Sequence, residues 1–390
     1  MRLSMNTRYA VIHASFWGAY GSLWAFIALV LEYNGFASAQ VGVVTSCATL
    51  LSVFLSPAVS SLLDARPGLE NRHGAMALLT LAAALCLLVW LVPLPRPFVL
   101  GACFALIGAL LSSTPPFQNA MAMDANRCGI PVVYGFCRGV GSVSYAAAVL
   151  LLGFVLERHA PTLLLPVFAA LTACGLIAMA GFRLPERPDE AADRPAEHRS
   201  IAAVLRSHPR FALTLLGCMF FFLTHTISNT YMNALVGKAG GTASAVGTSL
   251  AISAVLELPA MTLVSRLQKR FSPGFFLRFA AGAEVVKFLI FYLAHSMPLI
   301  YLGQCMQFFQ FAVYAPATVY YVAAALPERD QLKGQSLIYV AGSGLGGALG
   351  NLLGGRLLDR SGIQAALLLG PVSAAASLLT FCFSTREDSR

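Results

Sequence analysis

The sequence predicts an all-α membrane protein in which twelve transmembrane helices form two six-helix bundles, with both termini in the cytoplasm. Three observations support this fold class. Hydrophobic residues make up 57% of the 390 residues and charged residues only 11%, whereas a soluble domain carries about a quarter charged residues. The apolar residues gather in runs of the roughly 20-residue length that a helix needs to cross a bilayer. A polar, proline-containing stretch near the middle divides these runs into two sets of equal number.

Each apolar run is expected to be a helix, because a lone strand in lipid would leave its backbone groups without hydrogen-bond partners. The first run follows a short stretch that carries only Arg2 and Arg8. Its full span length indicates a membrane helix rather than a cleaved signal peptide. The twelve runs cover residues 10–31, 39–62, 74–93, 97–121, 133–156, 161–182, 210–236, 243–265, 275–295, 298–325, 335–357 and 361–383.

The polar stretch predicts an N-terminal bundle over 1–182, a hydrated cytoplasmic linker over 183–209 and a C-terminal bundle over 210–390. Within the linker we expect a short surface helix near Ile201 to Arg206. The bundles repeat one another, since Pro259 follows Pro57, and Gly355 follows Gly153, at the same offset of 202 residues. Repeated halves of this kind place a solute site near the membrane midplane, at their interface.

The positions of the cations predict the orientation. Nineteen of the 26 Lys and Arg residues fall in the termini and in the connections on their side, and five fall on the opposite side. This asymmetry places both termini in the cytoplasm. The net charge of +9 is therefore a topology signal, and nucleic acid is not an expected partner. We expect a multi-pass protein of a bacterial inner membrane, surrounded by lipid.

Charged side chains inside the apolar runs are the first candidates for function, because burying a charge in a bilayer costs a few kcal/mol. Glu257 and Lys287 each lie nine residues from a cationic helix edge, which corresponds to a depth of about 13 Å. Either they line a cavity, with Glu257 binding solute or carrying a proton and Lys287 as its countercharge, or they form a structural ion pair. Glu284 lies three residues before Lys287, on the same helix face, so these two side chains could instead pair with each other.

Three further ionisable residues have two interpretations each. Arg138 either extends to the membrane interface or donates a forked pair of hydrogen bonds to the solute. Asp124 either pairs with Arg138 or belongs to a loop. His225 is either a proton relay, because its pKa lies near working pH, or a hydrogen-bonded packing residue.

Uncharged polar and aromatic residues add candidates for contact with the solute. Gln304, Gln307 and Gln310 recur every three residues, so they form one stripe, and we expect that stripe to face the protein interior. Asn119 is a further polar candidate.

Trp17, Tyr20 and Trp24 recur at helical spacing in the first run. Their rings either stack on a solute ring or serve in packing. Glycines gather in runs 133–156 and 335–357, where small residues let helices approach closely.

The composition argues against other classes of function. The nine cysteines are scattered singly, without a CxxC pair, so a disulfide framework or a zinc site is not expected. The sequence has no HExxH motif, no paired catalytic aspartates and no Cys/His cluster. We therefore expect no enzyme activity, no metal and no cofactor. A sensor or scaffold would need an appended soluble domain, and we expect none.

Three ordered motifs resemble one family over the full length of the chain. They are Tyr134-Gly-Phe-Cys-Arg138-Gly in run 133–156, Leu256-Glu257-Leu-Pro259-Ala260 in run 243–265, and Val319-Tyr-Tyr-Val322 followed by Lys333-Gly-Gln335 and the glycine-rich stretch to Asp359-Arg360. They resemble the major facilitator superfamily, in the branch that contains lactose permease, oligosaccharide:proton symporters and the phenylpropionate permease.

The resemblance implies a solute:cation symporter with alternating access. We expect a monomer that moves a small polar or weakly acidic solute, such as a sugar, glycoside, nucleoside or aromatic acid, with a proton as the coupling cation. It implies that Arg138 and Glu257 bind substrate, that Tyr145 stacks on it and that Lys287 is the cation of the ninth helix. We expect Asn119, Gln304, Gln307 and Trp24 to complete the substrate site.

Two departures from the family pattern matter for mechanism. In the loop after the second run, Asp64 and a shifted Arg66 remain as the expected gating residues. The family's proton-carrying His and Glu of the tenth helix fall on Gln307 and Gln310. Coupling would then depend on Glu257, Glu284, Asp124 or His225, and uncoupled uniport and proton-coupled efflux stay open as alternatives.

Overall fold

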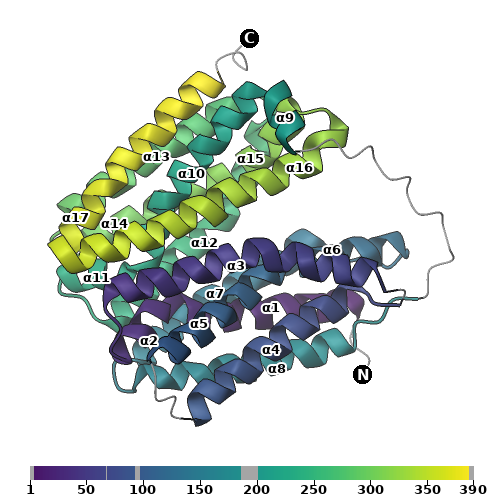
Figure 1. Ribbon diagram of the computed structural model, residues 1–390, viewed down its shortest axis with the longest axis horizontal. Helices are drawn as coiled ribbons and strands as arrows, with labels where there is room; N and C mark the ends of the chain where they lie inside the picture. Colours follow the sequence, from purple (N-terminus) through teal and green to yellow (C-terminus); the bar gives the residue numbers. More distant parts are fainter. Residues whose placement is uncertain (1–3, 67, 93–96, 186–200, 386–390) are drawn as a thin grey trace. The chain divides into compact units, whose positions relative to one another are not determined.

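The computed structural model describes residues 4–66, 68–92, 97–185 and 201–385 (Figure 1). These residues form helices and connections, with no strand among them. The chain divides into two compact units. Unit 1 consists of Met1–Pro188 with Thr242–Ala254, and unit 2 consists of Asp189–Gly241 with Val255–Arg390.

Unit 1 contains the helices of the first half of the sequence. They are α1 (Met5–Leu23), η1 (Trp24–Phe26), α2 (Ile27–Tyr33), α3 (Ser38–Asp64), α4 (Asn71–Leu91), α5 (Pro97–Ser113), α6 (Pro115–Arg127), α7 (Tyr134–Val155), η2 (Pro161–Leu163) and α8 (Leu164–Ala180).

Two of the predicted single helices in unit 1 are segmented. The first is interrupted by the 3₁₀ turn η1, and the fourth is divided between α5 and α6. Pro115 begins α6, and a proline suits the first helical position because its missing N–H would have no partner there. The start of α1 is capped by Ser4, whose hydroxyl oxygen accepts the Thr7 N–H at 3.1 Å.

Unit 2 contains the helices of the second half, and α12 begins in unit 1. They are α9 (Ile201–Ser207), α10 (Pro209–Thr230), α11 (Met232–Lys238), α12 (Ala243–Leu267), α13 (Pro273–Leu293), α14 (Met297–Cys305), η3 (Met306–Phe308), α15 (Phe311–Ala325), α16 (Glu328–Tyr339), the π-helical segment η4 (Val340–Gly346) and α17 (Gly347–Ser384).

The predicted helix over 298–325 is also segmented, because η3 and the non-helical backbone of Gln310 separate α14 from α15. The last two predicted helices are joined within α17, and Gly362 breaks the helical geometry between them with φ 74° and ψ 175°. This backbone region is accessible essentially only to glycine. The expected short helix of the linker is confirmed as α9, and Val204 anchors it in the apolar core of unit 2.

Ten helical stretches of the described chain are long and apolar enough to cross a membrane. The expected ninth span, α13, is not among them although it has 21 residues. Its sequence carries Arg278, Glu284 and Lys287 within less than three turns. The stretch Lys333–Ser384 counts as one of the ten because the helix continues past Gly362.

Glycines allow α10 to contact the segment formed by η4 and α17, which run side by side with it in unit 2 (Figure 1). A Cβ atom added to Gly346 would collide with the carbonyl oxygen of Met219, and one added to Gly350 would collide with that of Leu223. Both pairs are spaced by one helical turn, so the backbones approach along a stripe of small residues, as membrane helices often do. The expected role of these glycines in helix packing is confirmed.

Replacing Gly346 with alanine should therefore destabilise the protein. We expect a loss of about 1–3 kcal/mol, because the methyl group meets rigid backbone rather than a movable side chain. The measurement is the melting temperature of the detergent-solubilised protein. Gly282→Ala in α13 is the matched control, since nothing lies within 4 Å of its added Cβ. Equal melting of Gly346→Ala and wild type would contradict the close approach.

Candidate functional site

A buried amide connects two opposite charges in unit 2. The Nζ atom of Lys287 on α13 donates a hydrogen bond to Oε1 of Gln307 at 2.9 Å. Nε2 of Gln307 in η3 then donates to Oε1 of Glu257 on α12 at 3.1 Å. Lys287 is 1% exposed and Gln307 3%, while Glu257 is only partly buried. Lys287 and Glu257 are thus linked through Gln307, and Glu257 keeps an accessible side.

Glu284 has a different partner from the one that helical spacing suggests. Its Oε1 accepts a hydrogen bond from the hydroxyl of Thr224 on α10 at 3.0 Å, and the side chain is 0% exposed. Its other oxygen, Oε2, has no hydrogen-bond partner among the described residues. The hydrogen bonds of Glu284 and Lys287 therefore go to Thr224 and Gln307 rather than to each other.

The predicted glutamine stripe faces the interior, as expected. Gln304, Gln307 and Gln310 are 2%, 3% and 0% exposed. Gln310 lies at the break between η3 and α15, and its Nε2 is 3.4 Å from Nδ1 of His225. His225 also stacks on Phe311 with ring centroids 4.4 Å apart. His225 therefore packs against an aromatic ring, as a packing residue would, and also has the polar neighbour that a proton relay would need.

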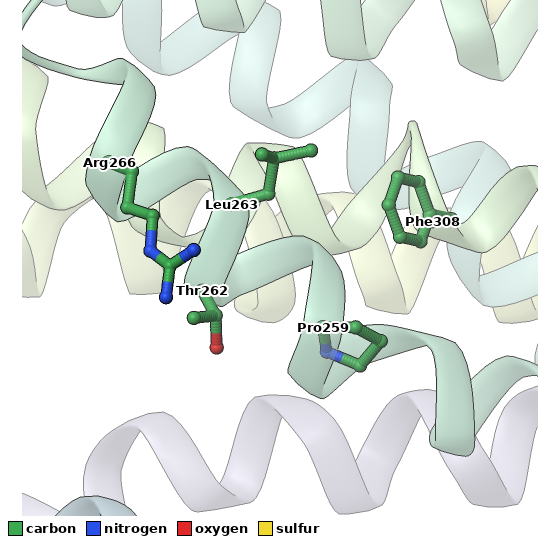
Figure 2. Close-up of a pocket in the computed structure, with 5 residues that line it drawn as sticks. All are labelled: Pro259, Thr262, Leu263, Arg266 and Phe308. Atoms are coloured by element: carbon green, nitrogen blue, oxygen red, sulfur yellow. The ribbon is translucent and has the colours of Figure 1, made fainter.

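A pocket of about 510 Å³ is lined by residues that lie close to Glu257 and Gln307 in the sequence (Figure 2). It is lined by Pro259, Thr262, Leu263 and Arg266 of α12 and by Phe308 of η3. Pro259 lies two residues after Glu257, and Phe308 directly follows Gln307. The proline inside α12 also removes one helical hydrogen bond near Glu257. Two of the three elements that position the bridge, α12 and η3, therefore border open space.

In unit 1, Arg138 lies over an aromatic ring. Its Cζ is 4.0 Å from the centroid of the Trp17 ring, a distance at which a guanidinium and an indole attract each other. Its NH1 donates a hydrogen bond to Oγ of Ser142 at 2.8 Å, one turn later in α7. The contact joins two residues that are far apart in the sequence, Trp17 on α1 and Arg138 on α7, and it holds the guanidinium beside the indole ring.

The other predicted solute contacts of unit 1 lie on η1, α6 and α7. Tyr145 of α7 packs where α1 has Gly21. Trp24 packs on Gly108 of α5, so tightly that any side chain at this position would overlap the indole. Packing accounts for Trp24, and its contact with solute remains a prediction. Asn119 accepts a hydrogen bond from the hydroxyl of Tyr134 at 3.2 Å.

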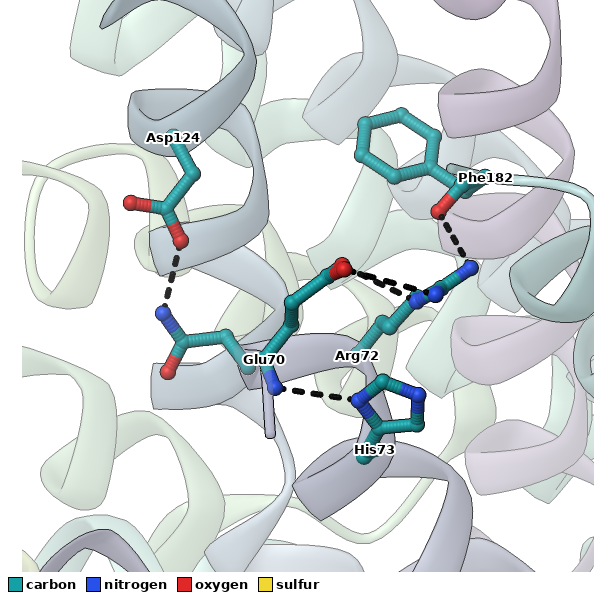
Figure 3. A network of polar contacts seen from close by, with 6 residues as sticks. Glu70, Arg72, His73, Asp124 and Phe182 are labelled. Carbon is teal, nitrogen blue, oxygen red and sulfur yellow. Dashed lines mark hydrogen bonds and ion pairs between the residues drawn. The ribbon is translucent and has the colours of Figure 1, made fainter. Parts of the chain in front are cut away.

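Asp124 takes part in a polar network at the start of α4 (Figure 3). Its Oδ2 accepts a hydrogen bond from Asn71 at 2.8 Å, and its Oδ1 lies 3.9 Å from NH1 of Arg127. These partners differ from the pairing with Arg138 that was one interpretation. Arg72 forms an ion pair with Glu70 at 2.9 Å.

The same network joins three segments of unit 1. NH1 of Arg72 donates to the carbonyl oxygen of Phe182, after α8, at 3.2 Å, and the backbone N–H of Glu70 donates to Nδ1 of His73 at 3.0 Å (Figure 3). The predicted gating residues lie just before this network. Arg66 is exposed in the turn after α3, and the side chain of Asp64 lies outside the described part of the structure.

Two buried polar residues of unit 1 were missed by the sequence analysis. His13 is 1% exposed and Gln118 is 0% exposed. The ring nitrogens of His13 and the amide nitrogen and oxygen of Gln118 have no hydrogen-bond partner in the described residues. Their positions in the sequence could have indicated them, because His13 lies one helical turn before Trp17 and Gln118 directly precedes Asn119, and both Trp17 and Asn119 were candidates.

Comparison with known proteins points to one family. The model of the MFS_1 like family matches residues 6–369. The maltose permease of Geobacillus stearothermophilus is 26% identical over 377 residues, covering 95% of this chain and 92% of the permease. The uncharacterized transporter YwbF of Bacillus subtilis is 22% identical over 395 residues, covering 100% of this chain and 96% of YwbF. The crystal structure of nucleoside transporter NupG superposes with a TM-score of 0.81 at 15% identity, covering 100% of both chains.

Proposed function

The chain belongs to the MFS_1 like family of membrane transporters, and from this premise we propose that it is a secondary active transporter of a small hydroxyl-bearing solute of the sugar or nucleoside class. The names of its relatives support this class: one is a maltose permease and another a nucleoside transporter. We place it in a bacterial inner membrane as a monomer. In this proposal the chain crosses the membrane twelve times with both termini in the cytoplasm, α13 is a span, and Gly362 separates the last two spans.

The observation that carries the proposal is the bridge from Lys287 through Gln307 to Glu257. Charges within a membrane protein usually mark a solute or ion pathway, because their burial is costly. The half-buried carboxylate of Glu257 can accept hydrogen bonds from solute hydroxyls. Gln307 donates a hydrogen bond to the same carboxylate and holds it in place. Sugars and nucleosides carry several hydroxyls that suit a carboxylate acceptor.

Unit 1, described by itself, has groups that also suit such a solute. The planar guanidinium of Arg138 can donate to a pair of hydroxyl oxygens, and the Trp17 ring that it covers offers an apolar face. Aromatic faces beside polar groups suit a pyranose or a nucleobase, which is apolar on its faces and polar at its edges. Tyr145 and Asn119 supply further contacts.

For coupling we propose Glu284 as the group that takes up and releases a proton. The carboxyl group is fully buried, and one of its oxygens lacks a hydrogen-bond partner among the described residues. A buried charge is expensive in such a place, and a bound proton removes it. Thr224, its hydrogen-bond partner within the described residues, is on α10, so a shift of this helix relative to α13 would change the environment of the carboxyl group.

The test is uptake by the purified protein reconstituted into liposomes. We expect labelled maltose or labelled uridine to accumulate when the lumen is alkaline, and to exchange without a gradient. Uptake that equilibrates regardless of the pH gradient would remove proton coupling and leave uniport. A protein that binds and transports neither compound, while folded by its melting curve, would contradict the solute class. Right-side-out and everted membrane vesicles then separate uptake from efflux.

A further inference from the structure

His13 and Gln118 leave four buried polar atoms unsatisfied. The imidazole nitrogens of His13 on α1 and the amide atoms of Gln118 on α6 have no hydrogen-bond partner within the described residues. The two side chains are 1% and 0% exposed. Buried polar groups are nearly always hydrogen-bonded, and the exceptions require an explanation. Four such atoms, on two residues that both contact Tyr9, suggest a partner that binds there.

Tyrosine contacts place the two residues in one region of unit 1. The hydroxyl of Tyr9 donates to the carbonyl oxygen of Gln118 at 2.9 Å, and the edge of the Tyr9 ring meets His13 with centroids 4.7 Å apart. Tyr134 lies on another side of His13, with ring centroids 6.0 Å apart, and its hydroxyl binds Asn119, the residue after Gln118. Three helices, α1, α6 and α7, therefore meet around the residues that carry these polar atoms.

The same region adjoins the Arg138–Trp17 pair. His13 precedes Trp17 by one turn of α1, and Tyr134 precedes Arg138 by one turn of α7. Residues spaced in this way lie on one helix face. His13 therefore lies next to the Arg138–Trp17 pair, which the proposed function assigns to solute binding.

The chemistry of the atoms defines the ligand. A neutral imidazole offers one donor and one acceptor, and a primary amide offers two donors and an acceptor. A hydroxyl group needs this combination, since it donates one hydrogen bond and accepts others. The guanidinium of Arg138 disfavours a cation nearby. An uncharged, hydroxyl-bearing group is the class that fits.

We propose that His13 and Gln118 form a hydroxyl-recognising subsite in unit 1 that binds the polyhydroxylated part of the solute. The proposal rests on the proposed function, because it takes the sugar or nucleoside as the ligand. It adds two specificity-determining residues, and it explains why α1 and α6 keep unpaired polar atoms in an apolar interior. Binding of the solute supplies the missing partners, and an analogue without hydroxyls leaves them unpaired.

The decisive experiment compares stability with affinity in purified His13→Phe and Gln118→Leu. Without solute, both variants should melt at or above the wild-type temperature, because each removes unpaired buried polar atoms. Their affinity for the probe that the wild type binds, maltose or uridine, should fall about tenfold to a hundredfold in equilibrium dialysis. His13→Gln keeps a donor and an acceptor and should retain affinity to within about threefold.

Thr172→Val is the matched control. Thr172 is 2% exposed and its hydroxyl also lacks a partner in the described residues, but it lies on α8, which contributes none of the groups above. We expect this variant to bind the probe as the wild type does. Lower melting temperatures of His13→Phe and Gln118→Leu with unchanged affinity would overturn the subsite and assign both residues a structural role. Unchanged melting and unchanged affinity, as for a site that holds only water, would overturn it as well.

The two proposals fail in different ways. If the folded wild-type protein binds neither maltose nor uridine, the proposed function fails, and the subsite fails with it. If the wild type binds a probe and both variants bind it equally well, only the subsite fails.

Discussion

Glu257→Gln is expected to abolish accumulation of the solute while the protein is still produced and inserted into the membrane. The substitution keeps an oxygen that can accept the hydrogen bond from Gln307 Nε2, now 3.1 Å from Glu257, so the fold should survive. It removes the charge that strengthens hydrogen bonds from solute hydroxyls, and bonds to a charged group contribute about 1.5–3 kcal/mol. Affinity should therefore fall by about tenfold to a hundredfold.

The measurement is uptake of labelled maltose and uridine into liposomes that contain equal amounts of each variant. Glu157→Gln is the control, because Glu157 is an exposed carboxylate at the end of α7. Hydrogen bonds from Ser244 and Thr242 hold the pKa of Glu157 below its ordinary value, so this control also removes an ionised carboxylate at neutral pH. Accumulation by Glu257→Gln at the wild-type level would remove Glu257 from the mechanism.

Lys287→Met is expected to be the most destabilising of the charge substitutions. The ammonium group is 1% exposed and donates to Gln307 at 2.9 Å. Removing one member of a buried set of charges leaves the other without compensation, and we expect a loss of about 3 kcal/mol. Adding Glu257→Gln to the same chain should recover about 1–3 kcal/mol of this loss, because the two charges are coupled through Gln307.

Melting temperatures of the two single variants and the double variant, measured in one detergent, give this coupling. The control cycle replaces Lys287→Met with Lys238→Met, since the Lys238 ammonium donates to the carbonyl oxygen of Tyr292 at 3.0 Å instead. Additive effects are expected in that control. Additive effects in the cycle of Lys287 and Glu257 would show that the bridge does not couple the charges. Transport should be absent in the double variant, which separates the stabilising role of the charges from their functional one.

Several side-chain positions could be predicted because they follow from local periodicity. The spacing of Gln304, Gln307 and Gln310 predicted one interior stripe, and all three are buried. The polar linker predicted the short helix α9. Pro57 and Pro259, equivalent by the repeat, each lie inside a helix, α3 and α12. Such features depend on neighbours in the chain, which a sequence displays directly.

Partners across helices could not be predicted in this way. The spacing of three residues allowed an ion pair of Glu284 with Lys287 as one alternative, but the hydrogen bonds of these side chains go to Thr224 and Gln307, which lie 60 and 20 residues away in the sequence. For Arg138 the sequence left two interpretations open, extension to the membrane interface and contact with the solute. In the structure its guanidinium lies over the Trp17 ring. These contacts are set by which helices are adjacent.

The sequence by itself determined that this chain is a helical membrane transporter and where its costly charges lie, because bilayer thickness and the burial of charge impose their patterns residue by residue. The three-dimensional arrangement of the helices was needed to show that Gln307 joins Lys287 to Glu257. It was also needed to show that His13 and Gln118, which both contact Tyr9, carry buried side-chain atoms without hydrogen-bond partners among the described residues. A hydrogen bond depends on distances of about 3 Å between atoms of different helices, and helical periodicity carries no information on that scale.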